Sequence, residues 1–465
     1  MANSRNTITD WNCEDPAFWQ ATGRRIARRN LIWSIFAEHI GFSIWLLWSV
    51  VATRLPKVGF SYTTEQLFQL VALPGLVGAF VRFPYTFAVP KFGGRNWTFV
   101  STLLLLIPTV SLAVLVQRPT TPFWLMALAA ASAGFGGGNF ASSMANISFF
   151  YPDREKGLAL GLNAAGGNLG VSTVQLFVPL ILGYALLPGA GIHLENAGLM
   201  WLPLIAVAAV GSFFFMDNLA SARSNFGDQI VVAKNRHTWI MSFLYIGTFG
   251  SFVGYSAAFP LLLKTQFPHL AMNLAFLGPL VGSIARPLGG KLADKVGGAR
   301  VTFWNFVLMT CLSCLLLLTL RRHSLPLFLT FFLSLFVTTG VGNGSTFRMI
   351  PLIFRALHSQ KARAAGPEAT ASALVTARRE TGAVLGIASG IGALGGYFIP
   401  RGLGASIKAS GGPEVALCCF IAFYVSCVAM TWWCYARLES KERSISELAP
   451  VALDPASAGV KWEQN

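Results

Sequence analysis

Two stretches of the sequence, related by a shift of 204 residues, decide how we expect the chain to fold. Residues 76–99 read LVGAFVRFPYTFAVPKFGGRNWTF, and residues 280–303 read LVGSIARPLGGKLADKVGGARVTF. Each stretch begins apolar enough to lie in lipid, contains one arginine (Arg82 or Arg286), and passes through a glycine pair toward a Thr-Phe step. The shared spacing predicts an internal repeat of membrane-spanning segments.

The composition is that of a polytopic membrane protein. Of the 465 residues, 54% are hydrophobic and 12% are charged, and the mean hydropathy is +0.57. A soluble chain of this length needs a more charged surface. The formal charge of +16 lies largely in short loops between apolar runs, which indicates basic cytoplasmic loops rather than a nucleic-acid-binding surface.

Apolar runs long enough to cross a membrane, for which about twenty residues suffice, recur along the whole chain. The loops richest in arginine and lysine follow the even-numbered runs, which predicts that both termini are cytoplasmic. The N-terminus is polar, so no cleavable signal peptide is visible. We expect an all-α, multi-pass protein of the cytoplasmic (inner) membrane. The twelve predicted spans are 31–54, 65–90, 98–117, 123–151, 157–187, 198–216, 237–263, 270–293, 301–320, 325–355, 379–400 and 414–436.

Further repeats divide the chain into two pseudo-symmetric six-helix bundles. Residues 160–170 read LGLNAAGGNLG, and residues 385–395 read LGIASGIGALG. The predicted organisation is a cytoplasmic tail (1–30), a first bundle (31–216), a cytoplasmic linker (217–236), a second bundle (237–436) and a cytoplasmic tail (437–465). Within the first tail, DPAFWQATGRRIARRN predicts either an interfacial helix or a flexible basic segment. In the helix, Phe18, Trp19 and Ile26 would reach the lipid headgroups.

Arg82 and Arg286 are predicted to lie at the same depth in the membrane. Each is about 10–13 Å from the cytoplasmic end of its span at the rise of an α-helix. Glu38 is the one clear acid deep in a predicted span, and one carboxylate cannot neutralise two arginines. We interpret the missing negative charge as the ligand, the alternative being that each arginine pairs with a helix end or an acid of its own half. Residues predicted at a similar level are Phe140, Asn163, Asn168, Tyr245 and Phe249.

The glycines of the fifth and eleventh spans have two interpretations. Small residues let helices touch backbone to backbone, so these positions could face a partner that slides when the two halves rock. They could equally mark static close packing. They are not phosphate-binding loops, because no strand precedes them. The candidate conformational glycines are Gly161, Gly166, Gly167, Gly170, Gly390, Gly392, Gly395 and Gly396.

Over nearly its whole length, the sequence resembles the major facilitator superfamily and, within it, the nitrate/nitrite porter family. The motifs that carry the resemblance are NFASSMANISFFYP (139–152), GLNAAGGNLGVS (161–172), LYIGTFGSFVGYSAAF (244–259), KTQFP (264–268) and GIGALGGYFIP (390–400). The resemblance implies a transporter of nitrate and nitrite that works by alternating access and serves nitrate assimilation. It implies that the arginines grip the anion, that Asn168 donates a hydrogen bond, and that three aromatic residues sandwich or gate it: Phe140, Tyr245 and Phe249.

Three residues depart from the exchange-type members of that family. Glu38 and His39 stand where those members have uncharged residues, and Arg348 stands where they have glutamine. We infer that Glu38 pairs with Arg348 across the cavity, with His39 beside them. A buried carboxylate or imidazole can take up a proton, which would permit proton-coupled nitrate uptake. The alternatives are a fixed ion pair that only shapes the cavity and obligatory nitrate/nitrite exchange.

The functional classes can be ranked. Two flat arginine forks among aromatic faces suit a small planar anion, although a transporter of another small anion, such as an organic acid, remains an alternative. An enzyme would need a nucleophile with a base, paired acids or metal ligands near the arginines. Cys311 and Cys314 lie in a leucine-rich run and are predicted to be lipid-buried thiols. We therefore expect no catalytic residue, cofactor or metal, and a monomer whose partners are the anion, lipid and, in the coupled alternative, a proton.

Overall fold

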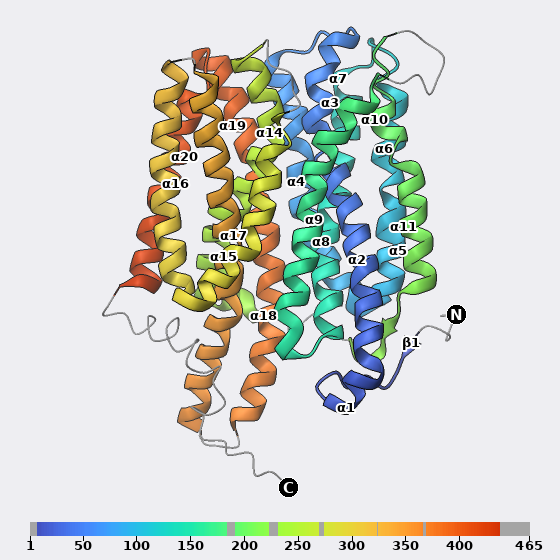
Figure 1. Ribbon diagram of the computed structural model, residues 1–465, viewed down its shortest axis with the longest axis vertical. Helices are drawn as coiled ribbons and strands as arrows, with labels where there is room; N and C mark the ends of the chain where they lie inside the picture. The colour runs from blue at the N-terminus through green and yellow to red at the C-terminus, as the bar shows by residue number, and fades with distance from the viewer. Residues whose placement is uncertain are drawn as a thin grey trace.

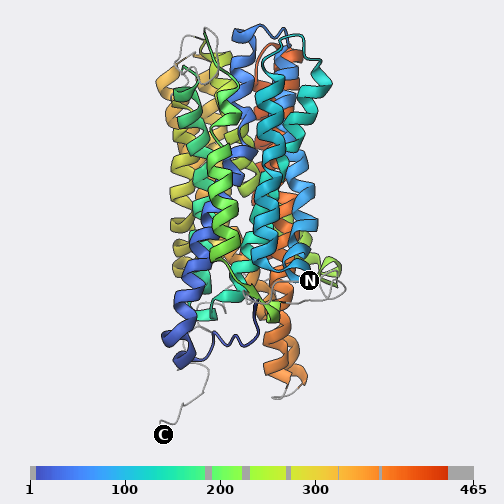
Figure 2. The same cartoon turned by 90° about the vertical axis from the view of Figure 1, so that its right-hand side faces the viewer.

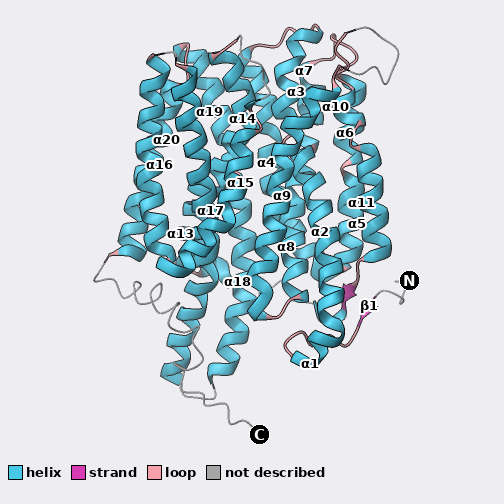
Figure 3. Ribbon diagram, viewed as in Figure 1, coloured by secondary structure: helices cyan, strands magenta, loops and turns pink. Residues whose placement is uncertain are grey.

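The computed structural model describes residues 7–183, 191–222, 231–268, 274–322, 324–365 and 369–437. These residues form a bundle of long helices that run between two ends (Figure 1). We call the end where α1 lies the lower end and the end where α10 lies the upper end, as in Figure 1. Helices dominate the described chain, as Figure 3 shows, so the all-α prediction is confirmed.

The N-terminal half makes six crossings of the bundle. Crossing one is built from five consecutive helical pieces, and crossings three, four and six are each built from two. In chain order the elements are α1 (Pro16–Phe18), η2 (Trp19–Gly23), α2 (Arg24–Trp45), α3 (Trp48–Arg54), η3 (Leu55–Val58), α4 (Thr64–Phe92), α5 (Gly94–Leu104), α6 (Leu106–Leu115), α7 (Phe123–Ser132), α8 (Gly134–Phe150), α9 (Asp153–Ile181), α10 (Asn196–Leu199) and α11 (Leu202–Phe215).

The C-terminal half makes the other six crossings, and a linker with short elements joins it to the first half. The linker contains β2 (Asn218–Leu219), η4 (Ala220–Ala222) and η5 (Val231–Lys234). The crossings are built from α13 (Arg236–Tyr245), η6 (Ile246–Gly250), α14 (Ser251–Gln266), α15 (Leu277–Val296), α16 (Gly298–Arg321), α17 (Leu325–Ala365), α18 (Ala369–Ala393), α19 (Gly395–Ser410), α20 (Glu414–Thr431) and η8 (Trp432–Ala436).

Ten helical stretches of the described chain are long and apolar enough to span a membrane. The two remaining crossings fall short for local reasons. The fourth, α7 and α8, is made less apolar by the glycine and polar residues at the start of α8, from Gly134 to Asn139. The eighth, α15, carries four charged side chains within 20 residues, one of them Arg286. Ten strong spans and these two weaker ones account for the twelve predicted crossings.

The repeated glycine pairs end one helix and start the next. Gly93 and Gly297 close α4 and α15 with φ angles of +86° and +100°, a region that favours glycine because it has no Cβ. The second glycine of each pair, Gly94 or Gly298, is the first residue of the following helix. The two halves therefore repeat the same turn at the lower end.

The first crossing begins earlier than predicted, at Pro16. The Asp15 side chain accepts hydrogen bonds from the backbone N–H groups of Ala17 and Phe18 and so caps this helix. The expectation that Trp19 reaches the lipid headgroups is wrong. Trp19 is only 2% exposed, and its ring nitrogen donates to Glu155 on α9 at 2.8 Å.

The beginning of the linker packs against the N-terminal half. Strand β1 (Thr7–Ile8) pairs in parallel with β2 at the lower end, as Figure 3 shows. Of the predicted linker, residues 223–230 lie outside the described residues, as does the predicted C-terminal tail from 438 onward.

The two halves lie side by side in Figure 1, with the N-terminal half on the right. Helices α4 and α9 of the first half and α14, α15, α18 and α19 of the second meet along the boundary between them. Helices α17 and α18 extend past the rest of the bundle at the lower end (Figures 1 and 2). Both helices therefore continue beyond the predicted spans 325–355 and 379–400 at that end.

Candidate functional site

Arg82 and Arg286 converge on one aromatic ring near the middle of the bundle. Both side chains are buried, with 0% and 5% of the residue exposed. The guanidinium carbon of Arg82 lies 4.7 Å from the centre of the Phe140 ring, and that of Arg286 lies 5.5 Å from it. These arginines come from α4 and α15, the repeat-related helices of the two halves, so the repeat forms one shared site at their boundary.

Arg82 is held by backbone carbonyl groups rather than by an acid. Its Nε donates to the carbonyl of Gly137 at 2.9 Å, and its Nη1 donates to the carbonyl of Ser389 at 3.0 Å. Gly137 belongs to the N-terminal half and Ser389 to the C-terminal half. The third nitrogen, Nη2, is buried and has no hydrogen-bond partner within the described chain. This nitrogen is available to a ligand.

Arg286 has a weaker set of partners. Its Nη2 lies 3.5 Å from the hydroxyl oxygen of Tyr245, at the long limit for a hydrogen bond. Its guanidinium carbon also lies 5.5 Å from the centre of the Phe347 ring, a cation–π contact. Its Nη1 is buried and has no partner among the residues that the structure describes. Each arginine thus keeps one donor nitrogen free inside the protein.

Aromatic rings frame the two arginines from both halves. Phe140 and Phe249 stack with their centroids 5.9 Å apart and an angle of 24° between the rings. Tyr245 stacks on Phe249 at 5.2 Å. The Arg82 guanidinium also lies over Phe249 at 4.8 Å and over Trp45 at 5.2 Å. The site is therefore cationic, aromatic and shielded from water, conditions in which charge-assisted hydrogen bonds are strong.

Glu38 lies close enough for its charge to interact with both arginines, but hydroxyl and amide groups hold it. Ser143 on α8 and Asn163 on α9 donate to its Oε2, the latter at 2.8 Å. Its Oε1 is buried without a hydrogen-bond partner in the described chain. Asn168, predicted to donate to the anion, is buried, and its Oδ1 also has no partner among the described residues. One acid beside two arginines leaves a net positive site.

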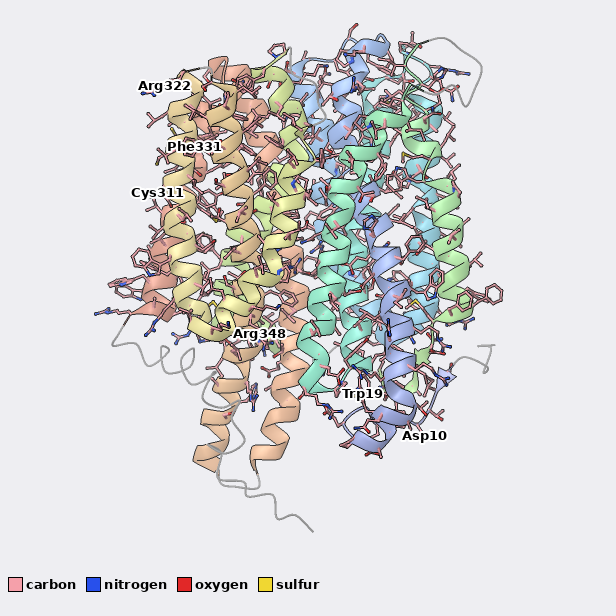
Figure 4. All side chains as sticks on the ribbon, viewed as in Figure 1. Asp10, Trp19, Cys311, Arg322, Phe331 and Arg348 are labelled. Atoms are coloured by element: carbon pink, nitrogen blue, oxygen red, sulfur yellow. The ribbon has the colours of Figure 1, made fainter. Side chains whose placement is uncertain are left out.

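The predicted pair between Glu38 and Arg348 is wrong. The Arg348 Nε donates to Asp294 at 2.6 Å, and both side chains are partly exposed, at 33% and 42%. Figure 4 shows Arg348 near the lower end of the bundle, away from its middle. Solvent there lowers the cost of the charge, and a carboxylate on the neighbouring α15 is within reach. The fixed-pair alternative for Glu38 is therefore excluded.

His39 does not lie beside an ion pair either. Its Nδ1 is 2.9 Å from the carbonyl oxygen of Gly166 on α9. Residues adjacent on a helix project about 100° apart, so Glu38 and His39 reach the same depth but point to different neighbours. The predicted depth in the membrane alone therefore cannot show which of the two residues faces the arginines.

The glycines of α9 pack within one half. A Cβ atom at Gly166 would meet Ile35, one at Gly167 would meet Glu38, and one at Gly170 would meet the backbone of His39. All three contacts are with α2 of the same half. They agree with the close-packing interpretation of these glycines and contradict the interpretation that they face the other half. At Gly161, nothing in the described chain lies within 4 Å of the added atom.

The glycines of the eleventh crossing divide between the two halves. A Cβ at Gly390 would lie 3.1 Å from Phe83, and one at Gly396 would lie 3.3 Å from the Cα of Gly75. Both neighbours belong to α4 of the N-terminal half. Gly392 and Gly395 instead approach Tyr245 and Gly250 of their own half. Of these four glycines, Gly390 and Gly396 therefore approach the other half, and a Cβ at Gly396 would also lie 2.9 Å from Val253 of its own half.

Five residues at the site are absent from the predicted set: Trp45, Gly137, Ser143, Phe347 and Ser389. Gly137, like Ser389, accepts from Arg82 through its carbonyl group. Trp45 lies seven residues after Glu38, which is two helical turns and therefore the same face. Ser143 follows Phe140 by three residues, so the same argument finds it. Phe347 directly precedes Arg348. In the sequence, Arg348 stands out by its charge, but Phe347 is the residue that contacts Arg286. Ser389 contributes only its carbonyl group, and no side-chain pattern reveals that.

Cys311 and Cys314 are free thiols on the exposed face of α16. Figure 4 shows Cys311 on the outside of the bundle. Their position is distant from the two arginines and gives the site no redox or metal chemistry.

Two repeated six-helix halves around a buried pair of arginines are the architecture of a membrane transporter. A model of the Major Facilitator Superfamily matches residues 32–400, and the chain belongs to that superfamily, whose members are transporters and not enzymes. The chain is 45% identical to the nitrate/nitrite transporter NarU of Escherichia coli (strain K12), over 95% of this chain and 98% of that protein.

Other relatives carry related names. The chain is 46% identical to the nitrate/nitrite transporter NarU of Salmonella typhimurium, over 95% of this chain and 98% of that protein. It is 37% identical to a protein of Thermus thermophilus named probable nitrate/nitrite antiporter NarK2, over 92% of this chain and 96% of that protein. The superfamily predicted from the sequence motifs is confirmed.

Proposed function

We propose that the protein is a secondary transporter that moves nitrate and nitrite across the cytoplasmic membrane by alternating access. The observation that carries the proposal is the pair of unpaired donor nitrogens, Nη2 of Arg82 and Nη1 of Arg286, buried around one Phe140 ring. The names of the relatives support nitrate and nitrite as the cargo.

The chemistry of the site favours a small planar oxyanion. A guanidinium group donates in its own plane and matches the oxygens of a flat anion. Aromatic faces offer the flat anion stacking contacts but no acceptor groups that would compete with it. Asn168 supplies an amide, which is both donor and acceptor. A tetrahedral phosphate group would need more hydroxyl or cationic donors than these residues provide.

We infer that the lower end of the bundle faces the cytoplasm. Most of the arginine and lysine at the ends of the helices lies there, for example Arg24, Arg154 and Lys295, and segments rich in these residues stay on the cytoplasmic side. Both termini are then cytoplasmic and the upper end faces outward. The transporter acts as a monomer, since each chain contains both repeat-related arginines.

We further infer that Glu38 takes up the coupling proton, so that the protein can drive nitrate uptake with a proton gradient besides exchanging nitrate for nitrite. Burial disfavours the ionised form of a carboxyl group, and a nearby cation favours it. An anion that binds the two arginines reduces the effect of their charge on Glu38. Anion binding and proton binding at Glu38 therefore favour each other, as symport requires.

Counterflow in proteoliposomes tests the proposal. Vesicles loaded with nitrite receive labelled nitrate outside, first without and then with an inward proton gradient. Nitrate entry against internal nitrite, with chloride and acetate competing poorly, is the expected result. If acetate competes as well as nitrate, the protein is a transporter of other small anions. If the rate of nitrate entry does not depend on the proton gradient, the coupling at Glu38 is contradicted.

A further inference from the structure

Glu38 is one end of a line of hydrogen-bonded side chains inside the N-terminal half. Ser143 on α8 donates to Glu38 Oε2. The hydroxyl oxygen of Ser34, one turn before Glu38 on α2, lies 3.0 Å from that of Ser143. All three side chains are buried, with between 1% and 7% of each residue exposed. Two hydroxyl groups thus connect the carboxylate to a point one helical turn closer to the lower end.

Asn163 orients the middle of this line. Its amide nitrogen donates both to Glu38 and to the oxygen of Ser143. With its oxygen accepting from Asn163, the Ser143 hydroxyl is left to direct its own proton at Glu38. A hydroxyl that donates to a carboxylate and accepts from another hydroxyl is arranged to pass a proton along the line.

The same face of α2 continues to the lower end. One turn beyond Ser34, the amide nitrogen of Asn30 donates to Asp217 at 2.8 Å, and the backbone N–H of Asp217 donates to Asn30 at 2.9 Å. Asp217 also pairs with Arg29 at 2.7 Å, and the side chain of Arg29 is 47% exposed. The polar face therefore ends at Asp217, a buried carboxylate whose partner Arg29 reaches solvent.

Beyond Ser143, which borders the anion site, this route follows α2. That helix packs on α8, α9 and α11 of its own half, whereas the two arginines and the stacked rings lie at the boundary between the halves. Other charged groups act on Glu38 from that boundary, namely Arg82 on α4 and Arg286 on α15. His39, the neighbour on α2, faces the Gly166 carbonyl.

We propose that Ser143 and Ser34 form a proton relay that exchanges the Glu38 proton with the solvent at the lower end, through the interior of the N-terminal half. For release, Glu38 gives its proton to the Ser143 oxygen as the Ser143 proton passes to Ser34 and the Ser34 proton passes to water. Each hydroxyl receives one proton and loses one, so only the carboxyl group changes its charge. The proposal rests on Glu38 as the coupling site and names the positioning residues that serve it.

The test compares Ser34→Ala with Ser34→Thr in full-length protein in proteoliposomes. Two rates are measured in the same vesicles: nitrate uptake driven by a proton gradient, followed together with internal pH, and nitrate/nitrite exchange at equal pH. We expect Ser34→Ala to slow proton-driven uptake about tenfold or more, as loss of a positioned proton carrier does. Exchange should be unchanged, and Ser34→Thr, which keeps the hydroxyl, should restore uptake.

The exchange rate also reports whether the variant has folded, and wild-type protein offers a check that needs no variant. In heavy water, proton-driven uptake should slow while exchange should not. Equal losses of both activities in Ser34→Ala would mean that its hydroxyl only supports the structure, and the relay would be refuted.

The relay and the coupling site can fail separately. If Glu38→Gln abolishes proton-driven uptake and Ser34→Ala leaves it intact, the proton leaves through the boundary between the halves and only the relay is wrong. If wild-type protein moves no protons with nitrate, both inferences are wrong.

Discussion

Phe140 and Phe249 stack on each other across the boundary between the two halves, with their ring centroids 5.9 Å apart. Arg82 lies within 4.8 Å of the centre of each ring, so one cation contacts both. In the proposed transport cycle, this stack would separate on one side as the halves rock, while Arg82 holds the anion. The stack therefore couples the shape of the site to the movement of the halves.

The first prediction concerns Phe249→Leu, which keeps an apolar side chain but removes the aromatic face. A buried cation–π contact contributes roughly 0.5–2 kcal/mol, so the KM for nitrate should rise by about twofold to thirtyfold. Nitrate/nitrite exchange in proteoliposomes gives the KM.

Phe332→Leu is the matched control, because Phe332 stacks on Phe259 at 4.5 Å away from the arginines. The control should lower thermal stability without changing the KM. If Phe249→Leu has the same KM for nitrate as the wild type, the Phe249 ring does not belong to the binding site.

The second prediction concerns Arg82→Lys and Arg286→Lys. An ammonium group cannot donate to the Gly137 and Ser389 carbonyls and to an anion in one plane. We expect each variant to lose about a hundredfold in exchange rate or more, as buried charge-assisted hydrogen bonds are lost. Initial rates of labelled nitrate exchange measure the loss.

Arg95→Lys is the control for the loss of a buried arginine. Arg95 is buried near the lower end and donates to the Phe213 carbonyl at 2.6 Å. Its variant should insert and exchange nitrate with an unchanged KM. Wild-type exchange by either Arg82→Lys or Arg286→Lys would contradict the site.

The sequence predicts which residues lie at the same depth in the membrane. For the two arginines, depth alone is enough to predict that they form one site. Arg82 and Arg286 are related by the repeat, and pseudo-twofold symmetry brings repeat-related residues to the same axis. Phe140 and Phe249 are predicted at a similar depth, and the family resemblance implies that they contact the anion. The number of crossings also follows from the sequence, since membrane thickness sets the length of an apolar helix.

The direction in which a side chain projects from its helix could not be predicted from the sequence in the same way. Glu38 and His39 differ by about 100° in direction, and only the packed neighbours show which one faces the arginines. Arg348 illustrates the related problem of competing partners: a nearer carboxylate, Asp294, satisfies it at the solvent-exposed end. A backbone partner such as the Ser389 carbonyl cannot be predicted from the residue type, because every residue has a carbonyl group.

The third prediction separates Glu38 from His39. Glu38→Gln keeps the shape of the side chain but cannot take up a proton, so proton-driven uptake should disappear while nitrate/nitrite exchange persists. His39→Gln should retain proton-driven uptake, because its ring binds the Gly166 carbonyl rather than the site. Uptake is followed after an external pH jump. Loss of the pH response in His39→Gln with normal response in Glu38→Gln would reverse the assignment.

The fourth prediction concerns the glycines of α9. A Cβ at Gly170 would press on the backbone carbonyl of His39, which cannot move aside, so Gly170→Ala should destabilise the protein by about 1–3 kcal/mol. Gly161→Ala, where the described chain leaves open space, should stabilise it by up to about 1 kcal/mol. Thermal unfolding in detergent compares the two. Similar melting temperatures would show that α9 does not pack on α2 as described.

The last prediction concerns the closed upper end. Glu65 on α4 accepts from Arg401 at 3.3 Å and from Lys408 at 2.7 Å, both on α19 of the other half. These side chains are partly exposed, so the two pairs are weak and salt weakens them further. Glu65→Gln should therefore raise the open fraction of the upper end by roughly twofold to fivefold.

A cysteine at Ser256 reports that opening. Ser256 is fully buried, and its carbonyl accepts a hydrogen bond from Gln175 of the other half at 2.7 Å, so a thiol there reacts with an impermeant maleimide only when the halves part. The reaction should speed up in Glu65→Gln at low salt, and the difference should vanish at high salt. Glu414→Gln, which removes another acid at the upper end, is the control and should leave the rate unchanged. A rate that is insensitive to Glu65→Gln at low salt would mean that apolar contacts alone keep this end closed.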